Sequence, residues 1–261
     1  MTTYEFCTVA REGKLSIITL NRPDVMNALH LEANLELSQV FDDFVADPEQ
    51  WVAIVTGAGD RAFSAGNDLK ATAAKGRTTL SPAGFGGLTS RTDIDKPLIA
   101  AVNGIAMGGG FEIALACDII LASENAIFAL PEPRVGLAAL GGGVHRLPRE
   151  IGMKRALGMI LTARRVSAQE GKELGFVNDV FPADKLMDAA RRLAGEILDL
   201  SPMSIRASKQ AVYWGLAEPS VAAALRSQSN YPAVVSMYGS EDLKEGPRAF
   251  AEKRKPQWKG R

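Results

Sequence analysis

The 261-residue chain has few of the residues on which several classes of protein depend. Its two cysteines, Cys7 and Cys117, lie far apart in the sequence and belong to no CxxC motif or Cys/His cluster. This argues against a disulfide framework and against a metal site, and it indicates reduced thiols in the cytosol. With only two histidines, a mechanism centred on histidine has few places. We expect His30 to cap a helix and His145 to be a structural or pocket-rim residue.

Surplus charge and long apolar runs are also missing. The chain has 30 Lys and Arg against 30 Asp and Glu, so it lacks the excess positive charge on which nucleic-acid binding rests. Its most apolar region, residues 98–122, is interrupted by Asn103, Glu112, Asp118 and four glycines and is no candidate for a membrane span. The first residues lack the basic and then apolar pattern of a signal peptide. We expect a cytoplasmic protein without nucleic-acid or membrane partners.

The composition, 46% hydrophobic and 23% charged, is that of an ordinary soluble globular protein. Short β-branched runs alternate with stretches of helical period, an order typical of an α/β fold with mostly parallel strands. The predicted strands are residues 15–20, 51–56, 98–102, 118–122 and 126–130, and the predicted helices are residues 31–45, 111–116, 184–200, 204–215 and 220–231. Because no strand is predicted after Pro182, we expect two parts, an α/β core over residues 1–195 and a helical region over residues 196–261.

Two stretches rich in small residues follow these strands. Residues 57–69 pass from a strand into a bend where Ser64, Ala65 and Gly66 are small enough for a ligand to approach the backbone. The other interpretation of this bend is a turn that needs glycine dihedral angles. Residues 76–90, rich in Gly, Thr, Ser and Pro, are predicted as a mobile surface loop.

Three glycines, residues 108–110, precede the helix that carries Glu112. Free N–H groups at a helix start, with the positive end of the helix dipole behind them, can hold an anion or a developing oxyanion. No lysine follows as in a phosphate loop, and Glu112 would repel a phosphate, whereas a base beside an oxyanion donor suits both features. The alternative is close packing of the helix on a strand.

Glu132 lies between Pro131 and Pro133 at the end of an apolar strand, the usual location of α/β sites. The alternative is a solvated turn in which Glu132 pairs with Arg134. If the fold brings Glu112 and Glu132 together across a small pocket, their pKa values will split and the pair can serve as acid and base. The basic end of the chain, residues 244–261, is either a solvated helix end or a grip on a phosphorylated ligand.

Together and in this order, these segments resemble the crotonase, or enoyl-CoA hydratase/isomerase, superfamily over essentially the whole chain. The similar motifs are Asn21-Arg22-Pro23, Asn27-Ala28-Leu29, residues 62–70, residues 103–112, Cys117-Asp118, Pro131-Glu132, residues 171–175, Ser208-Lys209 and residues 250–254. The resemblance implies an α/β, crotonase-like spiral of ββα turns followed by a C-terminal helical trimerisation region, assembled as a homotrimer or a dimer of trimers. It also implies an acyl-CoA thioester as substrate, with coenzyme A part of that substrate and no separate cofactor.

The resemblance also assigns site residues by position. The backbone N–H groups of Asn67 and Gly109 are expected to form an oxyanion hole for the thioester oxygen. Glu112 and Glu132 are expected to be the two catalytic carboxyls of a hydratase. The residues expected to bind the substrate or coenzyme A are Ala28, Ala65, Gly66, Asp68, Leu69, Lys70, Leu140, Phe250 and Lys253. The last two match positions that often reach the nucleotide of a neighbouring subunit.

The sequence departs from the family pattern in three places. Asn67 stands where an alanine is common, and Asp24-Val25-Met26 stands where a basic residue is common. Residues 139–143 read Ala-Leu-Gly-Gly-Gly instead of Pro-Gly-Ala-Gly-Gly, which places the bulky Leu140 near the acyl or water site.

Because both glutamates are present, the resemblance favours an enoyl-CoA hydratase, a hydro-lyase that adds water reversibly to a 2,3-unsaturated acyl-CoA through an oxyanion-stabilised enolate. Two alternatives stay open. One is another reaction of the same scaffold, isomerisation of an enoyl-CoA or hydrolysis of an acyl-CoA. The other is a non-catalytic binder of acyl-CoA or RNA.

Overall fold

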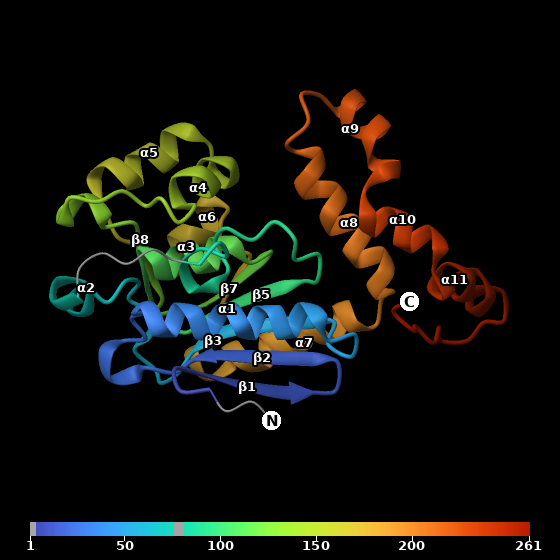
Figure 1. Cartoon of the computed structure of the whole chain (residues 1–261), viewed down its shortest axis with the longest axis horizontal. Helices are drawn as coiled ribbons and strands as arrows, with labels where there is room; N and C mark the ends of the chain where they lie inside the picture. The colour runs from blue at the N-terminus through green and yellow to red at the C-terminus, as the bar shows by residue number, and fades with distance from the viewer. Residues whose placement is uncertain (1–3, 76–80) are drawn as a thin grey trace.

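The computed structural model describes residues 4–75 and 81–261, and it is an α/β core with an arm of helices beside it (Figure 1). Two sheets form the core. The larger has the strand order β1 (Cys7–Glu12), β2 (Leu15–Leu20), β3 (Val52–Gly57), β5 (Leu98–Val102), β7 (Ile119–Ser123) and β10 (Asp179–Phe181). The smaller has the order β4 (Ala62–Ser64), β6 (Ile105–Met107), β8 (Ile127–Ala129) and β9 (Val166–Ser167). The predicted strands are confirmed to within a residue or two at each end, whereas β1, β4, β6, β9 and β10 were not predicted.

The chain alternates between the two sheets. It leaves β3 for β4, β5 for β6 and β7 for β8, and a helix follows β4 and β6. From β2 to β10 the neighbouring strands of the larger sheet are all parallel, as are β4, β6 and β8 in the smaller sheet. Each repeat of two strands and a helix thus adds one strand to each sheet, which gives the spiral of ββα turns.

Alternation along the parallel strands divides the core into two layers. One layer lies between the larger sheet and α7 (Leu186–Leu198). In it, the strand residues Ile17, Ile54 and Ile99 cluster with Ala190 of α7. The residues next to these in the strands, such as Ile18, Val55 and Ala100, point to the opposite face and join the larger cluster, which includes side chains of α1 (Leu31–Ala46) and α3 (Gly109–Ala116). β3 and β5 are buried along their whole length because both faces are covered.

The remaining helices lie around the core and in the arm. Around the core are α2 (Leu69–Lys75), α4 (Gly143–Ile151), α5 (Met153–Thr162) and α6 (Ala168–Leu174). The arm consists of α8 (Pro202–Gly215), α9 (Val221–Ser227), α10 (Pro232–Gly239) and α11 (Glu241–Ala251) (Figure 1). The helix predicted over residues 220–231 is interrupted, because α9 ends at Ser227 and Tyr231, which precedes a proline, takes an extended conformation.

Side chains of α8 tie the arm to the core. The ammonium of Lys209 donates to Asp118 Oδ2 at 2.7 Å, and the hydroxyl of Tyr213 donates to Asp118 Oδ1 at 3.0 Å. Arg206 pairs with Asp95 at 2.9 Å. These contacts hold α8 against the residues that precede β5 and β7. The division of the chain at residues 195 and 196, which falls inside α7, stays a prediction.

Part of one predicted surface loop is buried. Of residues 76–90, residues 76–80 lie outside the described chain, and residues 84–89 are buried. The short 3-10 helix Phe85–Gly87 packs between α1 and α3, and the amide of Gly86 donates to Asn34 Oδ1 at 2.6 Å. Gly86 takes a φ of 61°, and a side chain on it would meet Ile113 at 2.5 Å. The prediction of a surface loop is therefore wrong for this stretch, because its glycines serve close packing rather than mobility.

Candidate active site

The start of α3 provides free backbone donors. Gly108 turns the chain from β6 into α3 with a φ of 53°, and its amide donates to Ala129 O at 2.9 Å. The first intrahelical bond runs from the amide of Glu112 to Gly108 O at 2.9 Å. Within residues 4–75 and 81–261 the amide of Gly109 has no hydrogen-bond acceptor. The helix thus presents an N–H group and its positive end at this point.

A second free amide lies beside the first. The amide of Leu29 donates to Gly66 O at 2.8 Å and the amide of Asp68 donates to Leu29 O at 3.0 Å, so the amide of Asn67 between them has no acceptor in the described chain. Gly66 has a φ of 86°, and a Cβ on it would lie 3.0 Å from the nitrogen of Gly109. Only glycine permits this approach, and it places Asn67 next to the start of α3.

Glu112 lies one turn into α3 and is 5% exposed. Its Oε1 accepts a hydrogen bond of 2.9 Å from the amide of Gly143. A Cβ on Gly141 would lie 2.5 Å from Oε2 of the same carboxyl. Burial raises the pKa of Glu112, while hydrogen bonds from the amides of Gly143 and Gly141 and the charge of Arg146 act in the opposite direction. The glycines of residues 141–143 therefore form a cradle that fits a carboxylate.

Glu132 begins a 3-10 helix, Glu132–Val135, directly after Pro131. Its Oε2 is buried and has no hydrogen-bond partner in the described part of the chain. Burial raises the pKa of Glu132 to about 7, and the charge of Glu112 acts in the same direction. Arg134 does not pair with it and instead donates to Ala163 O at 3.3 Å. Glu132 therefore lies close enough to Glu112 to sense its charge, and it keeps its proton to a higher pH than an ordinary glutamate does.

Comparison with known proteins agrees with this geometry. A family model described as enoyl-CoA hydratase/isomerase matches residues 10–261. The chain belongs to the enoyl-CoA hydratase/isomerase family. It is 46% identical to the carnitinyl-CoA dehydratase of Citrobacter koseri over 259 residues, which cover 96% of this chain and 97% of that protein. It is also 46% identical to the carnitinyl-CoA dehydratase of Salmonella agona over 261 residues, covering 97% and 98% of the two chains.

Solved structures of the family share the fold. An enoyl-CoA hydratase from Mycobacterium tuberculosis matches with a TM-score of 0.91 and 37% identity, over 98% of this chain and 99% of that one. An enoyl-CoA hydratase from Bacillus anthracis matches with a TM-score of 0.90 and 34% identity, over 98% and 100%. The expected crotonase fold with C-terminal helices is confirmed, and the chain is an enzyme of this family.

Within the family frame, the structure brings some predicted residues together and leaves others apart. Gly66 brings the bend that holds Asn67 against the nitrogen of Gly109, and the charge of Glu112 acts on Glu132. A Cβ on Gly108 would lie 2.8 Å from Glu132 Oε1, so the residue before Gly109 contacts the second carboxyl. Phe250 is 87% exposed at the end of α11, on the arm, which lies away from α3 in Figure 1, and Lys253 follows it. These two do not reach the site of their own chain.

Except for Leu140, the other residues predicted to bind the substrate lie in or near the bend that holds Asn67. The amide of Ala65 donates to Met26 O at 2.9 Å, and the carboxylate of Asp68 pairs with Arg22 at 3.1 Å. Leu69 and Lys70 are exposed in the first turn of α2, whereas Ala28 is buried. Leu140 is 68% exposed, although Gly141 next to it contacts Glu112. Sequence reasoning missed the contacts of Gly108 and Gly141 with the two carboxyls.

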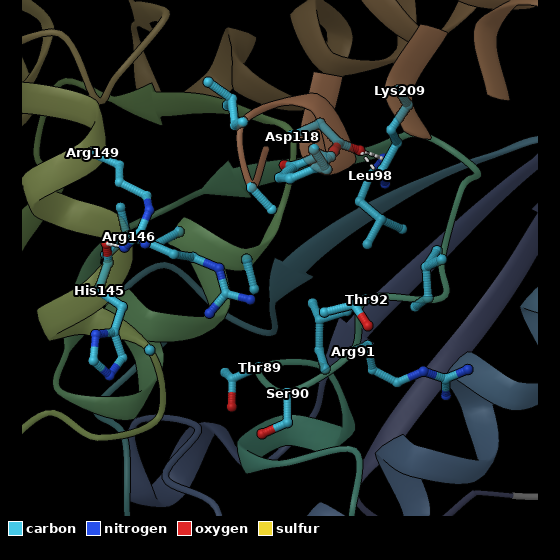
Figure 2. Close-up of a pocket in the computed structure, with 18 of the residues that line it drawn as sticks. Thr89, Ser90, Arg91, Thr92, Leu98, Asp118, His145, Arg146, Arg149 and Lys209 are labelled. Carbon is cyan, nitrogen blue, oxygen red and sulfur yellow. Dashed lines mark hydrogen bonds and ion pairs between the residues drawn. The ribbon is translucent and has the colours of Figure 1, made fainter. Parts of the chain in front are cut away.

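A cleft of about 1010 Å³ extends from the cradle glycines toward α8. Figure 2 shows Thr89 and Ser90 below it, His145 and Arg146 from α4 at one side, and the ion pair of Lys209 with Asp118 across it. His30 is confirmed as a helix cap, since its Nδ1 accepts from the amide of Ala33 at 3.1 Å, and the exposed His145 lies at the rim of the cleft.

Across residues 4–75 and 81–261, no group of three or more His, Cys, Asp or Glu side chains is placed to hold a metal ion. No helix in the same ranges is both long enough and apolar enough to cross a membrane.

Proposed function

We propose that the enzyme adds water reversibly to the C2–C3 double bond of an enoyl-CoA thioester. The observation that carries this proposal is the buried carboxyl of Glu112 together with the half-buried Glu132, beside the free amide at the start of α3. Hydration needs an activated water and a proton donor, and two carboxyls with different environments supply both functions.

The thioester oxygen is proposed to accept hydrogen bonds from the amides of Asn67 and Gly109. As water adds at C3, negative charge moves through the conjugated system to this oxygen. Two N–H donors and the positive end of α3 stabilise that charge more strongly than they stabilise the neutral thioester. The stabilisation thus lowers the barrier to the chemical step.

The surroundings of the two carboxyls support a different task for each. The amides of Gly143 and Gly141 favour the ionised form of Glu112, whereas Glu132 Oε2 has no hydrogen-bond partner among the residues that the structure describes. In the proposed step the Glu112 carboxylate takes a proton from water as the water oxygen bonds to C3. The protonated Glu132 then gives its proton to C2 of the enolate. Transfer of the proton from Glu112 back to Glu132 restores the starting state, and the reverse sequence removes water.

The likeness to carnitinyl-CoA dehydratases supports a second candidate substrate. Dehydration of carnitinyl-CoA is the same step in reverse, on an acyl group that carries a quaternary ammonium. Leu140 and the cradle glycines line the cleft, which also contains acidic and aromatic side chains that suit a quaternary ammonium. We propose that ligand binding is completed by a second copy of the chain in a trimer, because Phe250 and Lys253 lie on the arm, away from α3 of their own chain.

Absorbance of the conjugated enoyl thioester tests both candidates. Crotonyl-CoA should lose this absorbance with the wild-type enzyme, and carnitinyl-CoA should gain it if the charged acyl group is accepted. Loss with crotonyl-CoA alone identifies a simple enoyl-CoA hydratase, and faster gain with carnitinyl-CoA identifies the dehydratase. If neither changes, while a 3-enoyl-CoA gains absorbance, the enzyme is an isomerase and the hydration proposal is wrong.

A further inference from the structure

Arg146 is a half-buried cation on α4 that forms no ion pair within hydrogen-bonding range in the described residues. We propose that Arg146 is a positioning residue for the hydration step, which holds the cradle of residues 141–143 against Glu112 and keeps that carboxyl negatively charged. The proposal deepens the function proposed above and rests on it for its kinetic consequences.

The cradle connects Arg146 to Glu112. The amide of Arg146 donates to Gly142 O at 2.8 Å, and its guanidinium folds back over Gly142, where a Cβ would collide with Nη1. The next amide, that of Gly143, donates to Glu112 Oε1 at 2.9 Å. A side chain on Gly142 would therefore displace the guanidinium, and movement of the guanidinium would disturb the backbone that binds the carboxylate.

Most charged groups around Arg146 are paired with other residues, whereas the charge of Glu112 acts on Arg146. On α8, Lys209 pairs with Asp118 at 2.7 Å, and Tyr213, which also faces Glu150, donates to Asp118. Burial raises the pKa values of the Cys117 thiol and the Tyr213 phenol, so both groups are neutral near pH 7.

On α4 itself, the exposed Arg149 donates to the carbonyl of His145 at 2.6 Å. The 3-10 helix after Pro131 contributes Glu132, which faces Glu112 rather than Arg146. The charge of Glu112 acts on Arg146, whereas Glu150, four residues along α4, forms no ion pair with Arg146 within residues 4–75 and 81–261.

Keeping a cation at this place costs free energy. Burial lowers the pKa of the Arg146 guanidinium, which measures the loss of its hydration. A guanidinium is protonated in proteins at all ordinary pH values, so its charge acts on Glu112 throughout the working range. The interaction favours the ionised Glu112 that has to take a proton from water.

The decisive variants are R146M, which removes the charge and keeps most of the bulk, and R146K, which keeps the charge. R149M is the matched control, since Arg149 is on the same helix but exposed. In kcat/KM profiles with crotonyl-CoA, the acid limb of R146M should move to higher pH by about 1 pH unit, a tenfold loss at low pH. R146K and R149M should keep the wild-type limb. An unmoved limb in R146M, or an equal loss in R146M and R146K at every pH, would overturn the proposal.

A direct titration separates this proposal from the proposed function. Protein labelled with ¹³C at the glutamate carboxyls gives the Glu112 signal by NMR, with E112Q as the assignment control, and needs no substrate. The Glu112 titration should move to higher pH in R146M and stay in place in R146K. If the wild type turns over crotonyl-CoA but the signal does not move, the role of Arg146 is wrong and the function stands. If the signal moves without turnover, the function is wrong and the electrostatic role stands.

Discussion

Glu132 Oε1 occupies the space that a side chain on Gly108 would take, since a Cβ there would lie 2.8 Å from this oxygen. The glycine that turns the chain into α3 thus also sets the position of the carboxyl opposite. Gly109, which offers the free amide, follows it directly. Donor and acid are therefore positioned by one short segment of backbone.

The first prediction concerns this contact. G108A should lower kcat by about 10²-fold, because a displacement near 1 Å of a catalytic group has that effect. Gly152 provides the control, as its φ of 81° is also positive but nothing lies within 4 Å of an added Cβ. G152A should carry the backbone strain without the loss of turnover. Equal losses in both variants would show that strain, not the Glu132 contact, causes the effect.

The second prediction distinguishes the two carboxyls from each other. E112Q and E132Q should each lower the hydration rate by about 10²–10⁴-fold, the usual contribution of a general acid or base. In an isomerase that uses only Glu132, E112Q would keep most of its activity. Rates with crotonyl-CoA and with a 3-enoyl-CoA, measured on the same preparations, test this directly.

The third prediction concerns stability against pH. The pKa of Glu132 is raised from 4.5 to about 7 in the folded chain, so the unfolded chain releases this proton first as the pH rises. The stabilisation from Glu132 is thus present below pH 4.5 and lost as the pH passes about 7. E132Q does not titrate there, so its Tm should rise by several °C relative to that of wild type as the pH is raised through this window. A constant difference would contradict the raised pKa.

The fourth prediction concerns the arm. K209M leaves Asp118 without its cation and should lower the free energy of unfolding by about 3 kcal/mol, since both side chains are largely buried. The control is K172M, because the pair of Lys172 with Asp179 is exposed and should contribute less than about 1 kcal/mol. Denaturant unfolding of the two variants measures the difference. Similar small losses in both would mean that α8 is held mainly by other contacts.

How much the sequence predicts depends on the length of the pattern. β2 and β5 follow from apolar runs of five or six residues, and they are found where predicted. β4, β6 and β9 have only two or three residues, which is too short for any periodicity, so the smaller sheet was missed.

The site also has a part that the sequence predicts and a part that it does not. The residue types at Glu112, Glu132 and Gly109 could be read from local motifs. The cradle of Gly141 and Gly143 could not, because its contact with Glu112 depends on how α4 packs on α3. The stretch around Gly86 was predicted wrongly for a related reason, because a glycine in a tight core and one in a mobile loop look alike in sequence.

The central claim is that the two carboxyls add water across C2 and C3. Crotonyl-CoA incubated with the wild-type enzyme in D₂O enriched in ¹⁸O, followed by mass spectrometry of the product, tests it most directly. The proposed mechanism predicts one ¹⁸O at C3 and one deuterium at C2 in the same molecule, both incorporated about 10²–10⁴-fold more slowly with E132Q. Deuterium at C4 without ¹⁸O, or free coenzyme A as the product, would contradict it.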